Sequence, residues 1–547
     1  VRRLKFLTIT SYDGTKLNAD ASLPLPKTPS DRFPVVIMAN SWSVPQFEYV
    51  IQAQELAQAG YIILEYETRG WFFSGGEIDC AGEKDQRDIS EVISYVLSQS
   101  DWQADPGRIA LAGISYGAGL ALLGAGRDPR VKVAVAMSGW SDLQQALFKH
   151  NSPNLVWGEV LVVMAHVVGK PEPLLDEVWR QVLAGNVTAA QSFATLRSVL
   201  PYLPALENRS VPLFISNNFE DRLFYPEDAV ALYEQYKGPK RLLLNQGVHA
   251  SAEIGGLFGL PNNHVWLEVK KWLATYLKGE PGPSPPAVEM SNRAVRRSAK
   301  AADSEELTAC KLAEGSELWG NGMFTISGAF QRGEQFDVWP SSRLQRTTLV
   351  PSPRGRGFFG SLVPKGQEAP STAFESISFG KMTGINGGLP VIGELMQVFV
   401  DHRITSNLLL SSRKHAIWFY KQVDTERLCG TPLLNLDMTP SHAKWQVVAY
   451  LLGVNRITKV GTLISHGSLT CWNCTAGQRG TYQITLRTLC EDLGGLGMGG
   501  IGLALNMYSA LYEPANSEEA LTMDFHYSEN FSLEIPVAES KSPSILV

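Results

Sequence analysis

The stretch Gly113-Ile-Ser115-Tyr-Gly117 has the G-x-S-x-G spacing of a serine placed on a turn between a strand and a helix. Residues 108–113, RIALAG, predict a strand, and residues 116–126, YGAGLALLGAG, predict a helix. Ser115 then lies at the carboxyl edge of a sheet, where open α/β folds keep their sites. Because a side chain would clash on so tight a turn, the two flanking glycines fit the same interpretation.

A serine hydroxyl needs a base to remove its proton, and the base needs a carboxylate that fixes its tautomer. On this kind of fold the chain order is serine, then acid, then histidine. Asp221 follows the predicted strand VPLFISNN (211–218), and His249 follows the predicted strand KRLLLNQG (240–247). We therefore predict a catalytic triad of Ser115, Asp221 and His249.

Other residues compete for these roles. Glu220 is the alternative acid, and we favour Asp221 because it lies just before a helix that begins with a proline. His264 opens an amphipathic helix and is expected at the surface or at a helix cap. His150 and His166 fall in a helical segment, where a lone histidine is expected to be structural.

Hydrolysis also needs hydrogen-bond donors for the oxyanion of a tetrahedral intermediate. On this fold one donor is the backbone N–H after the nucleophile, here Tyr116, and the second comes from the loop after the third strand. We predict the Trp42 backbone N–H as the second donor, with Ser41 as the near alternative. Residues near these positions are expected to form an apolar substrate pocket beside Trp42: Ser41, Trp71, Phe72 and Trp157.

The elements that must position these residues are strands alternating with helices over the first 280 residues. Short β-branched runs such as FPVVIMAN (33–40) are typical of buried strands, and QFEYVIQAQELAQAG (46–60) has apolar residues at helical spacing. Alternating strands and helices indicate a mostly parallel sheet covered on both faces. The fold class is therefore α/β, of the α/β-hydrolase kind.

The pattern divides the chain into parts. Residues 1–141 and 211–279 are predicted to form the catalytic domain, and the Leu-, Val- and Ala-rich residues 142–210 a helical cap inserted into it. Residues 280–300 hold EPGPSPP and the basic stretch RAVRRSAK and predict a linker. Residues 301–547 offer short alternating runs between turn residues, which predict a β-sandwich of the jelly-roll kind.

Composition narrows the function further. The 547 residues carry a formal net charge of −6, with 44% hydrophobic and 19% charged residues, as in a soluble globular protein. No basic excess points to nucleic acid, and no apolar run reaches the length of a membrane span. The start, VRRLKFLTITSYDG, predicts a strand rather than a signal peptide. The sequence leaves open whether the protein is cytoplasmic or secreted after processing.

Six cysteines are too few for a disulfide scaffold at this length. Cys471-Trp-Asn-Cys474 has redox or zinc-ligand spacing, but neither a second cysteine pair nor a nearby histidine pair completes a zinc site. A local disulfide or two buried thiols is the expected state. We predict no metal and no cofactor.

The sequence resembles the cocaine esterase and Xaa-Pro dipeptidyl-peptidase family of α/β-hydrolases. The segments that carry the resemblance are DGTKLNADASLPLP, YETRGWFFSGGE, DPGRIALAGISYGAG, the loops of Asp221 and His249, TPLLNLDMTPSHAKWQVVAYLLGV and YSENFSLEIPV. The family implies a serine hydrolase of esters or amides, with a helical cap and a C-terminal jelly roll. Esterase members carry a tyrosine after the third strand whose hydroxyl helps to bind the oxyanion, and this chain has Trp42 there.

These observations predict a serine hydrolase that cleaves carboxylic esters of small molecules through an acyl-enzyme. Two alternatives stay open: an Xaa-Pro-type dipeptidyl peptidase or amide hydrolase, and an acyltransferase that uses the same acyl-enzyme. The peptidase would need a carboxylate for the substrate amine, and the cap offers four that are expected on solvated helix faces: Glu159, Glu172, Asp176 and Glu177. Formation of a homo-oligomer also stays open.

Overall fold

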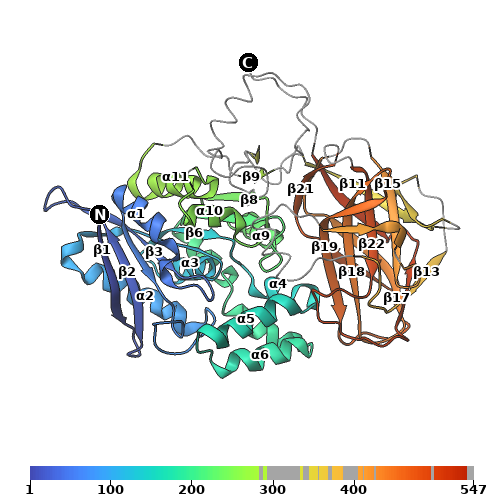
Figure 1. Cartoon of the computed structure of the whole chain (residues 1–547), viewed down its shortest axis with the longest axis horizontal. Coiled ribbons are helices and arrows are strands. Elements are labelled where there is room, and N and C mark those ends of the chain that lie inside the picture. The colour runs from blue at the N-terminus through green and yellow to red at the C-terminus, as the bar shows by residue number, and fades with distance from the viewer. Residues whose placement is uncertain are drawn as a thin grey trace, which may run out of the picture.

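The computed structural model describes residues 1–260, 262–281, 288–291, 333–336, 344–354, 357–367, 373–385, 404–410, 412–423, 427–493 and 498–538. Two sheets organise them, one of ten strands and one of fourteen (Figure 1). The predicted strands FTISGAF (324–330) and LMQVFVDH (395–402) lie outside the described residues, as does most of the predicted linker.

The first sheet is mostly parallel, as the sequence predicts, and has the order β1-β2-β4-β3-β5-β6-β7-β8-β9-β10. Neighbours from β4 through β3 to β9 pair in parallel, whereas β1, β2 and β10 join in antiparallel pairs. The strands are β1 (Arg2–Thr10), β2 (Lys16–Leu23), β3 (Phe33–Ala39), β4 (Ile62–Tyr66), β5 (Ala104–Ile114), β6 (Val131–Met137), β7 (Leu213–Asn218), β8 (Lys240–Asn245), β9 (Val288–Ser291) and β10 (Gly333–Phe336).

Helices cover both faces of this sheet, because successive side chains of a strand point to opposite sides. In β3, Val36 and Met38 belong to a core shared with α1 (Val50–Gln58), α10 (Ser251–Leu257) and α11 (His264–Lys278). Val35 and Ile37 belong to the core of the other face. Its helices are α2 (Glu83–Ser98), α3 (Tyr116–Arg127) and α9 (Pro226–Gln235).

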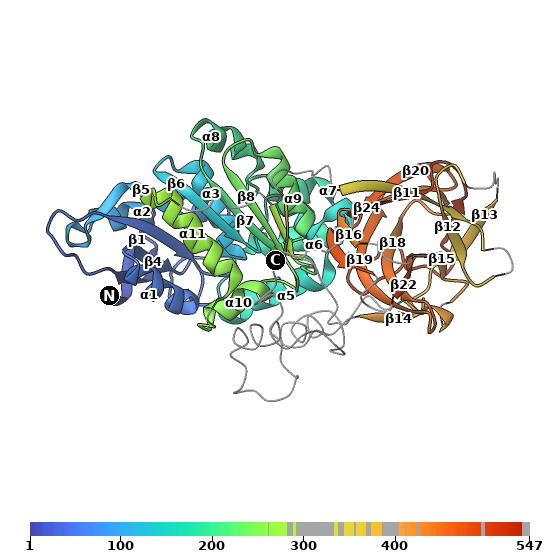
Figure 2. The same cartoon turned by 90° about the horizontal axis from the view of Figure 1, so that it is seen from above.

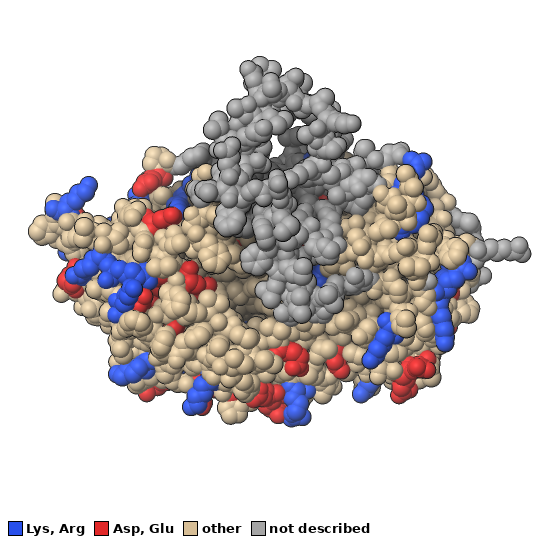
Figure 3. Space-filling model, viewed as in Figure 1, with Lys and Arg blue, Asp and Glu red and all other residues tan. Residues whose placement is uncertain are grey.

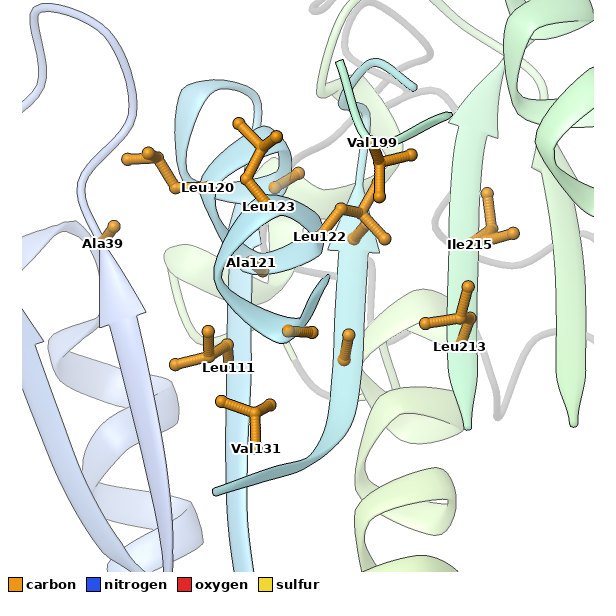
Figure 4. Close-up of a cluster of buried hydrophobic side chains, with 14 of the residues drawn as sticks. Ala39, Leu111, Leu120, Ala121, Leu122, Leu123, Val131, Val199, Leu213 and Ile215 are labelled. Carbon is orange, nitrogen blue, oxygen red and sulfur yellow. The ribbon is translucent and has the colours of Figure 1, made fainter. Parts of the chain in front are cut away.

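Helix α3 packs directly on the middle of the sheet. Leu120, Leu122 and Leu123 belong to the same buried cluster as Leu111 of β5 and Leu213 of β7 (Figure 4). Each fully buried leucine contributes roughly 1.5–3 kcal/mol of burial free energy. This packing holds the start of α3 against the carboxyl end of β5, and with it the turn that joins them.

Five helices lie between β6 and β7, in the segment for which the sequence predicts a cap (Figure 2). The longest is α5, which is apolar on nearly all its faces and contributes to two small cores under the cap. The helices of this segment are α4 (Leu143–Leu147), α5 (Leu155–Val168), α6 (Pro173–Leu183), α7 (Val187–Thr195) and α8 (Leu203–Asn208), of which α8 packs on the sheet side against α3 through Leu203 and Leu206.

The C-terminal half is strand-rich and forms the second sheet, whose pairs are antiparallel except β12 with β15. Its core is a single large apolar cluster with a smaller one beside it. The strands are β11 (Leu344–Ser352), β12 (Gly360–Pro364), β13 (Phe374–Ser378), β14 (Thr405–Asn407), β15 (Ala416–Gln422), β16 (Arg427–Gly430), β17 (Leu433–Pro440), β18 (Trp445–Asn455), β19 (Val460–Cys471), β20 (Gly480–Thr485), β21 (Leu489–Asp492), β22 (Met498–Asn506), β23 (Thr522–His526) and β24 (Ser532–Ala538).

The connection between α4 and α5 contacts β19 and the residue after it. His150 Nδ1 lies 3.0 Å from the Ser468 carbonyl oxygen, and the Trp472 indole donates to the Asn151 carbonyl oxygen at 2.8 Å. The cap and the strand-rich half therefore support each other where the chain enters α5.

Among the described residues of the C-terminal half, two disulfides occur, Cys471–Cys474 and Cys429–Cys490. The Cys471–Cys474 pair is thus a local disulfide rather than two buried thiols, the two states expected from the sequence. Cys429–Cys490 joins the neighbouring strands β16 and β21. None of the described helices is long and apolar enough to cross a membrane. On the face shown in Figure 3, basic and acidic side chains are interspersed, in keeping with the mild net charge.

Candidate active site

Ser115 lies on the sharp turn between β5 and α3, with φ of +56° and ψ of −116°. A Cβ on Gly113 would lie 2.4 Å from the backbone of Gly117, and a Cβ on Gly117 would lie 2.3 Å from the Ala39 carbonyl oxygen. Both positions therefore require glycine because backbone segments approach too closely for any side chain. The left-handed conformation at Ser115 is strained, as strand-to-helix nucleophile turns are.

Three predicted side chains form one hydrogen-bonded chain. His249 Nε2 lies 2.9 Å from Ser115 Oγ, and His249 Nδ1 lies 2.8 Å from Asp221 Oδ2. The other oxygen, Asp221 Oδ1, accepts backbone N–H bonds from Leu223 and Phe224, each at 2.9 Å. These contacts fix a fully buried carboxylate in one orientation, with one oxygen on the histidine.

Asp221 rather than Glu220 faces His249. The two loops are joined where Glu220 donates its backbone N–H to the Gly247 carbonyl oxygen at 2.8 Å. The imidazole packs edge-on against Trp157 and Phe224, with ring centroids 5.9 and 5.3 Å away. These apolar contacts limit rotation of the ring and exclude water from its faces.

The remaining histidines lie elsewhere. His264 Nε2 pairs with Glu289 Oε1 at 2.9 Å at the start of α11, and His166 Nε2 pairs with Asp176 Oδ1 at 2.9 Å on the cap. Burial lowers the pKa of His150 to about 4, with the positive charge of Lys149 as a further cause. His150 is therefore neutral at physiological pH and supports the contact with β19.

The predicted oxyanion donors lie on adjacent elements. Tyr116 opens α3, where backbone N–H groups have no partner within the helix. The Ser41 N–H donates to Glu48 Oε1 at 2.5 Å and the Ser41 hydroxyl to the Ile114 carbonyl oxygen at 3.1 Å. Because the backbone N–H and the hydroxyl of Ser41 are both engaged, Trp42 is the better placed of the two loop residues to donate to an oxyanion. Burial raises the pKa of Glu48 to about 8.

The Trp42 side chain faces the cap. Its indole N–H donates to the Leu161 carbonyl oxygen of α5 at 3.0 Å. Its ring lies edge-on to Trp71 and Tyr116, with centroids 4.7 and 5.2 Å away. The Trp42 indole therefore joins the loop after β3 to helix α5, at the position where the resemblance implies a tyrosine in esterases.

Tyr116 is also held through its side chain. Its phenol donates to Asp85 Oδ2 at 2.6 Å, and the Ala81 N–H lies within hydrogen-bond distance of both groups. Burial raises the pKa of the Asp85 carboxyl, and the nearby carboxylates Asp79 and Asp88 raise it further. Asp85 carries no signal in the sequence, because its contact with Tyr116 depends on how α2 packs against α3.

A cavity begins at Ser115 and continues under the cap. Trp42 and Tyr116 line its mouth, and helices α4, α5, α6 and α7 supply most of its wall. Four of the predicted pocket residues are not part of this lining: Ser41, Trp71, Phe72 and Trp157.

The four residues have other surroundings. Trp71 is fully buried behind Trp42, and Phe72 keeps 37% of its surface exposed. The Ser41 hydroxyl points to a backbone carbonyl, and Trp157 lies against His249. The prediction identified the aromatic layer around the cavity mouth rather than the wall of the cavity itself.

The sequence analysis missed the residues that form the wall, among them Trp140, Phe148 and Phe193. Trp140 had a usable signal, because it comes just after β6, at the same sheet edge as Ser115 and Asp221. Phe148 and Phe193 carry no such signal, since their place depends on how the cap helices pack. Cys80 also lines the cavity, and burial raises the pKa of its thiol to about 12.

The described residues contain no group of three or more His, Cys, Asp or Glu side chains that could hold a metal ion. The sheet, the turn at Ser115 and the inserted helices together define the class: the chain has an α/β-hydrolase fold with an added C-terminal β domain.

Comparison with known proteins agrees with this class. Residues 13–251 match the family model of X-Pro dipeptidyl-peptidase (S15 family), which is the family that the sequence resembles. The matched region contains the strands and loops that carry Ser115, Asp221 and His249. A thiohydrolase of Arthrinium phaeospermum is 35% identical over 107 residues, 19% of this chain and 34% of that protein. The aligned part thus spans about a third of that curated relative.

Solved structures share the two-part architecture at low identity. A CocE/NonD family hydrolase from Staphylococcus aureus superposes with a TM-score of 0.68 at 13% identity, covering 98% of this chain and 94% of the other. An α-amino acid ester hydrolase gives 0.69 at 14% identity, covering 98% and 96%. An aminopeptidase from a marine sediment Thaumarchaeota archaeon gives 0.67 at 14%, with the same coverage of 98% and 96%.

Proposed function

We propose that this hydrolase cleaves carboxylic esters through an acyl-enzyme formed on Ser115. His249 takes the serine proton as Oγ attacks the ester carbonyl, and Asp221 orients the imidazole and stabilises its charged form. The backbone N–H groups of Tyr116 and Trp42 stabilise the oxyanion. The proton then passes from His249 to the departing alcohol, and water hydrolyses the acyl-enzyme by the same steps in reverse order.

One observation carries the proposal. The chain Asp221–His249–Ser115 has hydrogen bonds of 2.8 and 2.9 Å at the mouth of a cavity that a substrate could occupy. A buried carboxylate that already accepts two backbone N–H bonds suits the role of orienting a base, because its geometry is fixed before substrate binds.

The test compares kcat/KM for a short-chain p-nitrophenyl ester and for an Xaa-Pro anilide on wild type and Ser115→Ala. We expect ester cleavage in the wild type, its loss by at least about 10³-fold in the variant, and little anilide cleavage. Covalent labelling of Ser115 by a fluorophosphonate, absent in Ser115→Ala, is the independent measure of nucleophile activation. Ester activity unchanged by Ser115→Ala would refute the proposal.

Thioester hydrolysis is the second candidate, favoured by the 35% identity to a protein named a thiohydrolase. The same acyl-enzyme serves both reactions, because only the leaving atom differs. An N-acetylcysteamine thioester and the matched ethyl ester of one acid separate the two. A higher kcat/KM for the thioester than its greater intrinsic reactivity explains would favour this candidate.

The peptidase alternative draws on the name of the family model, and the acyltransferase alternative needs only a second acceptor for the acyl group. Preferential cleavage of the Xaa-Pro anilide would favour the first. Faster turnover on addition of alcohols or amines, with the transfer product formed, would favour the second.

A further inference from the structure

The cavity beside Ser115 is apolar along nearly its whole length. Of the residues that the structure describes, those lining it include no Asp, Glu, Lys, Arg or His. Beyond Ser115, the polar side chains in the wall are few, with Gln144 from α4 the one amide among them. An uncharged, apolar substrate group can therefore enter the cavity at little cost in hydration. A charged group would lose its hydration and find no charged partner in the wall.

The acidic residues of the cap are engaged elsewhere. Glu159 accepts the Trp179 indole N–H at 2.9 Å, and Glu172 pairs with Lys84. Asp176 pairs with His166, and Glu177 pairs with Arg180. None of the four lines the cavity, so the cap supplies no carboxylate there for a substrate ammonium group.

The position of the cavity relative to the base indicates which half of the substrate it takes. Ser115, Tyr116 and Trp42 line it, and His249 does not. A leaving group must depart within reach of His249 Nε2, because that atom donates the proton to it. The group in the cavity is then the one that stays bonded to Ser115 Oγ.

We propose that the cavity under the cap is an acyl site for a long, apolar and uncharged acyl chain. The proposal rests on the proposed function, because it assigns one side of the same ester bond to this cavity. It goes beyond that function by excluding acyl groups that carry an α-ammonium and by naming the residues that limit chain length.

Helix α7 sets the depth of the site. Ala190 and Ala194 lie four residues apart, hence on one face of the helix, and both line the cavity with at most 5% of their surface exposed. Their small side chains leave the space that a longer residue would fill. Val182 of α6 also lines the cavity, so shortening it would enlarge the same space.

The experiment uses p-nitrophenyl esters from acetate to dodecanoate, so that the leaving group is constant. We expect kcat/KM to rise about fourfold for each methylene that the cavity buries, up to a limiting length. Ala194→Leu and Ala190→Leu should move the limit to shorter chains. Val182→Ala should move it to longer chains. Thr195→Leu, at an exposed position of the same helix, is the matched control.

A second pair of substrates tests charge at fixed shape. The p-nitrophenyl esters of leucine and of 4-methylpentanoic acid differ only in the α-ammonium group. We expect the uncharged ester to be cleaved roughly 100-fold faster, because the ammonium has no counterion in the wall. Equal rates, or a faster reaction of the leucine ester, would overturn the proposal.

Binding without turnover separates this inference from the proposed function. Decanoate should bind to Ser115→Ala by calorimetry and bind at least tenfold more weakly when Ala194→Leu is added. If esters are cleaved but kcat/KM does not depend on acyl length, or depends on the length of the alcohol instead, the assignment of the cavity to the acyl chain is wrong. If decanoate binds as expected but no ester or thioester is cleaved, the acyl site stands and the proposed function fails.

Discussion

The phenol of Tyr116 donates to the buried carboxyl of Asp85 at 2.6 Å, so the residue after Ser115 is held from both sides. Its backbone opens α3 beside the nucleophile, and its side chain reaches α2. A proposed oxyanion donor is thus fixed by a hydrogen bond formed well away from the reacting atoms. This arrangement positions the donor before substrate arrives, which is what electrostatic stabilisation of a transition state requires.

This relationship predicts the effect of Tyr116→Phe. Removing the hydroxyl leaves a buried acceptor on Asp85 without this donor, so we expect a loss of about 1–3 kcal/mol in the free energy of unfolding. kcat should fall with little change in KM, since the oxyanion donor is less well fixed. Tyr66→Phe is the control, because the buried Tyr66 hydroxyl has no hydrogen-bond partner among the described residues. Equal losses in both variants would contradict the prediction.

Asp221→Asn tests the assignment of the acid. The amide cannot stabilise the charged imidazole and favours the wrong tautomer, so we expect kcat to fall by about 10⁴-fold while the fold is retained. Glu220→Gln, one residue away, should leave kcat within a few-fold of wild type. Stopped-flow assays on both variants, with circular dichroism as the check on folding, measure the difference. A larger loss in Glu220→Gln would reverse the assignment.

Glu48 predicts a pH dependence of stability. Its folded-state pKa, about 8, lies above the ordinary value of 4.5 because the carboxyl is buried. The folded state therefore holds a proton that the unfolded state releases, and the stabilisation is complete below pH 4.5 and is lost as pH rises through about 8. Glu48→Gln keeps an acceptor for the Ser41 N–H but cannot ionise.

The measurement is urea unfolding between pH 5 and pH 9. Relative to wild type, Glu48→Gln should gain stability progressively toward pH 9. Glu55→Gln, at an exposed position on α1, controls for the removal of a carboxylate as such. A difference between Glu48→Gln and wild type that does not change with pH would show that ionisation of Glu48 is not its cause.

Trp42→Phe removes the indole N–H that joins the oxyanion loop to the cap through the Leu161 carbonyl oxygen. We expect a loss of about 0.5–1.5 kcal/mol in stability, the usual net value of one hydrogen bond. KM for long acyl esters should rise more than KM for acetate, because the cap wall contacts only the longer chain. The ratio of the two KM values is the quantity to measure, and an unchanged ratio would contradict the prediction.

The hydrogen-bonded chain of Ser115, His249 and Asp221 could be predicted from the sequence because each of its members is marked by local features. Ser115 has glycines that its tight turn demands, and Asp221 and His249 each follow a β-branched or leucine-rich strand. Parallel strands bring their carboxyl ends to one edge, so order along the chain becomes proximity in space. The α/β fold and the strand-rich C-terminal half followed from the same periodicities.

The wall of the cavity could not be predicted in this way. Most of its residues come from the four helices α4, α5, α6 and α7, whose mutual packing has no signal in local periodicity. Trp71 and Trp157 are aromatic and close to the site, yet Trp71 is covered by Trp42 and Trp157 packs against the His249 imidazole. Their residue type and their position in the sequence predicted that they lie near the substrate. Only the tertiary arrangement decides which side chains line the cavity.

The cap enters and leaves the sheet between β6 and β7, which are adjacent parallel strands. The chain therefore leaves the sheet at the carboxyl end of β6 and crosses to the opposite edge before it enters β7, and the helices between the two strands can vary in number or length while the strand register stays the same. Under the proposed function, most residues that would select the substrate belong to this insertion, and the residues that would cleave the bond belong to loops at the edge of the sheet. Exchange of the inserted helices for those of another hydrolase would then change the acyl preference while Ser115, His249 and Asp221 stay in place.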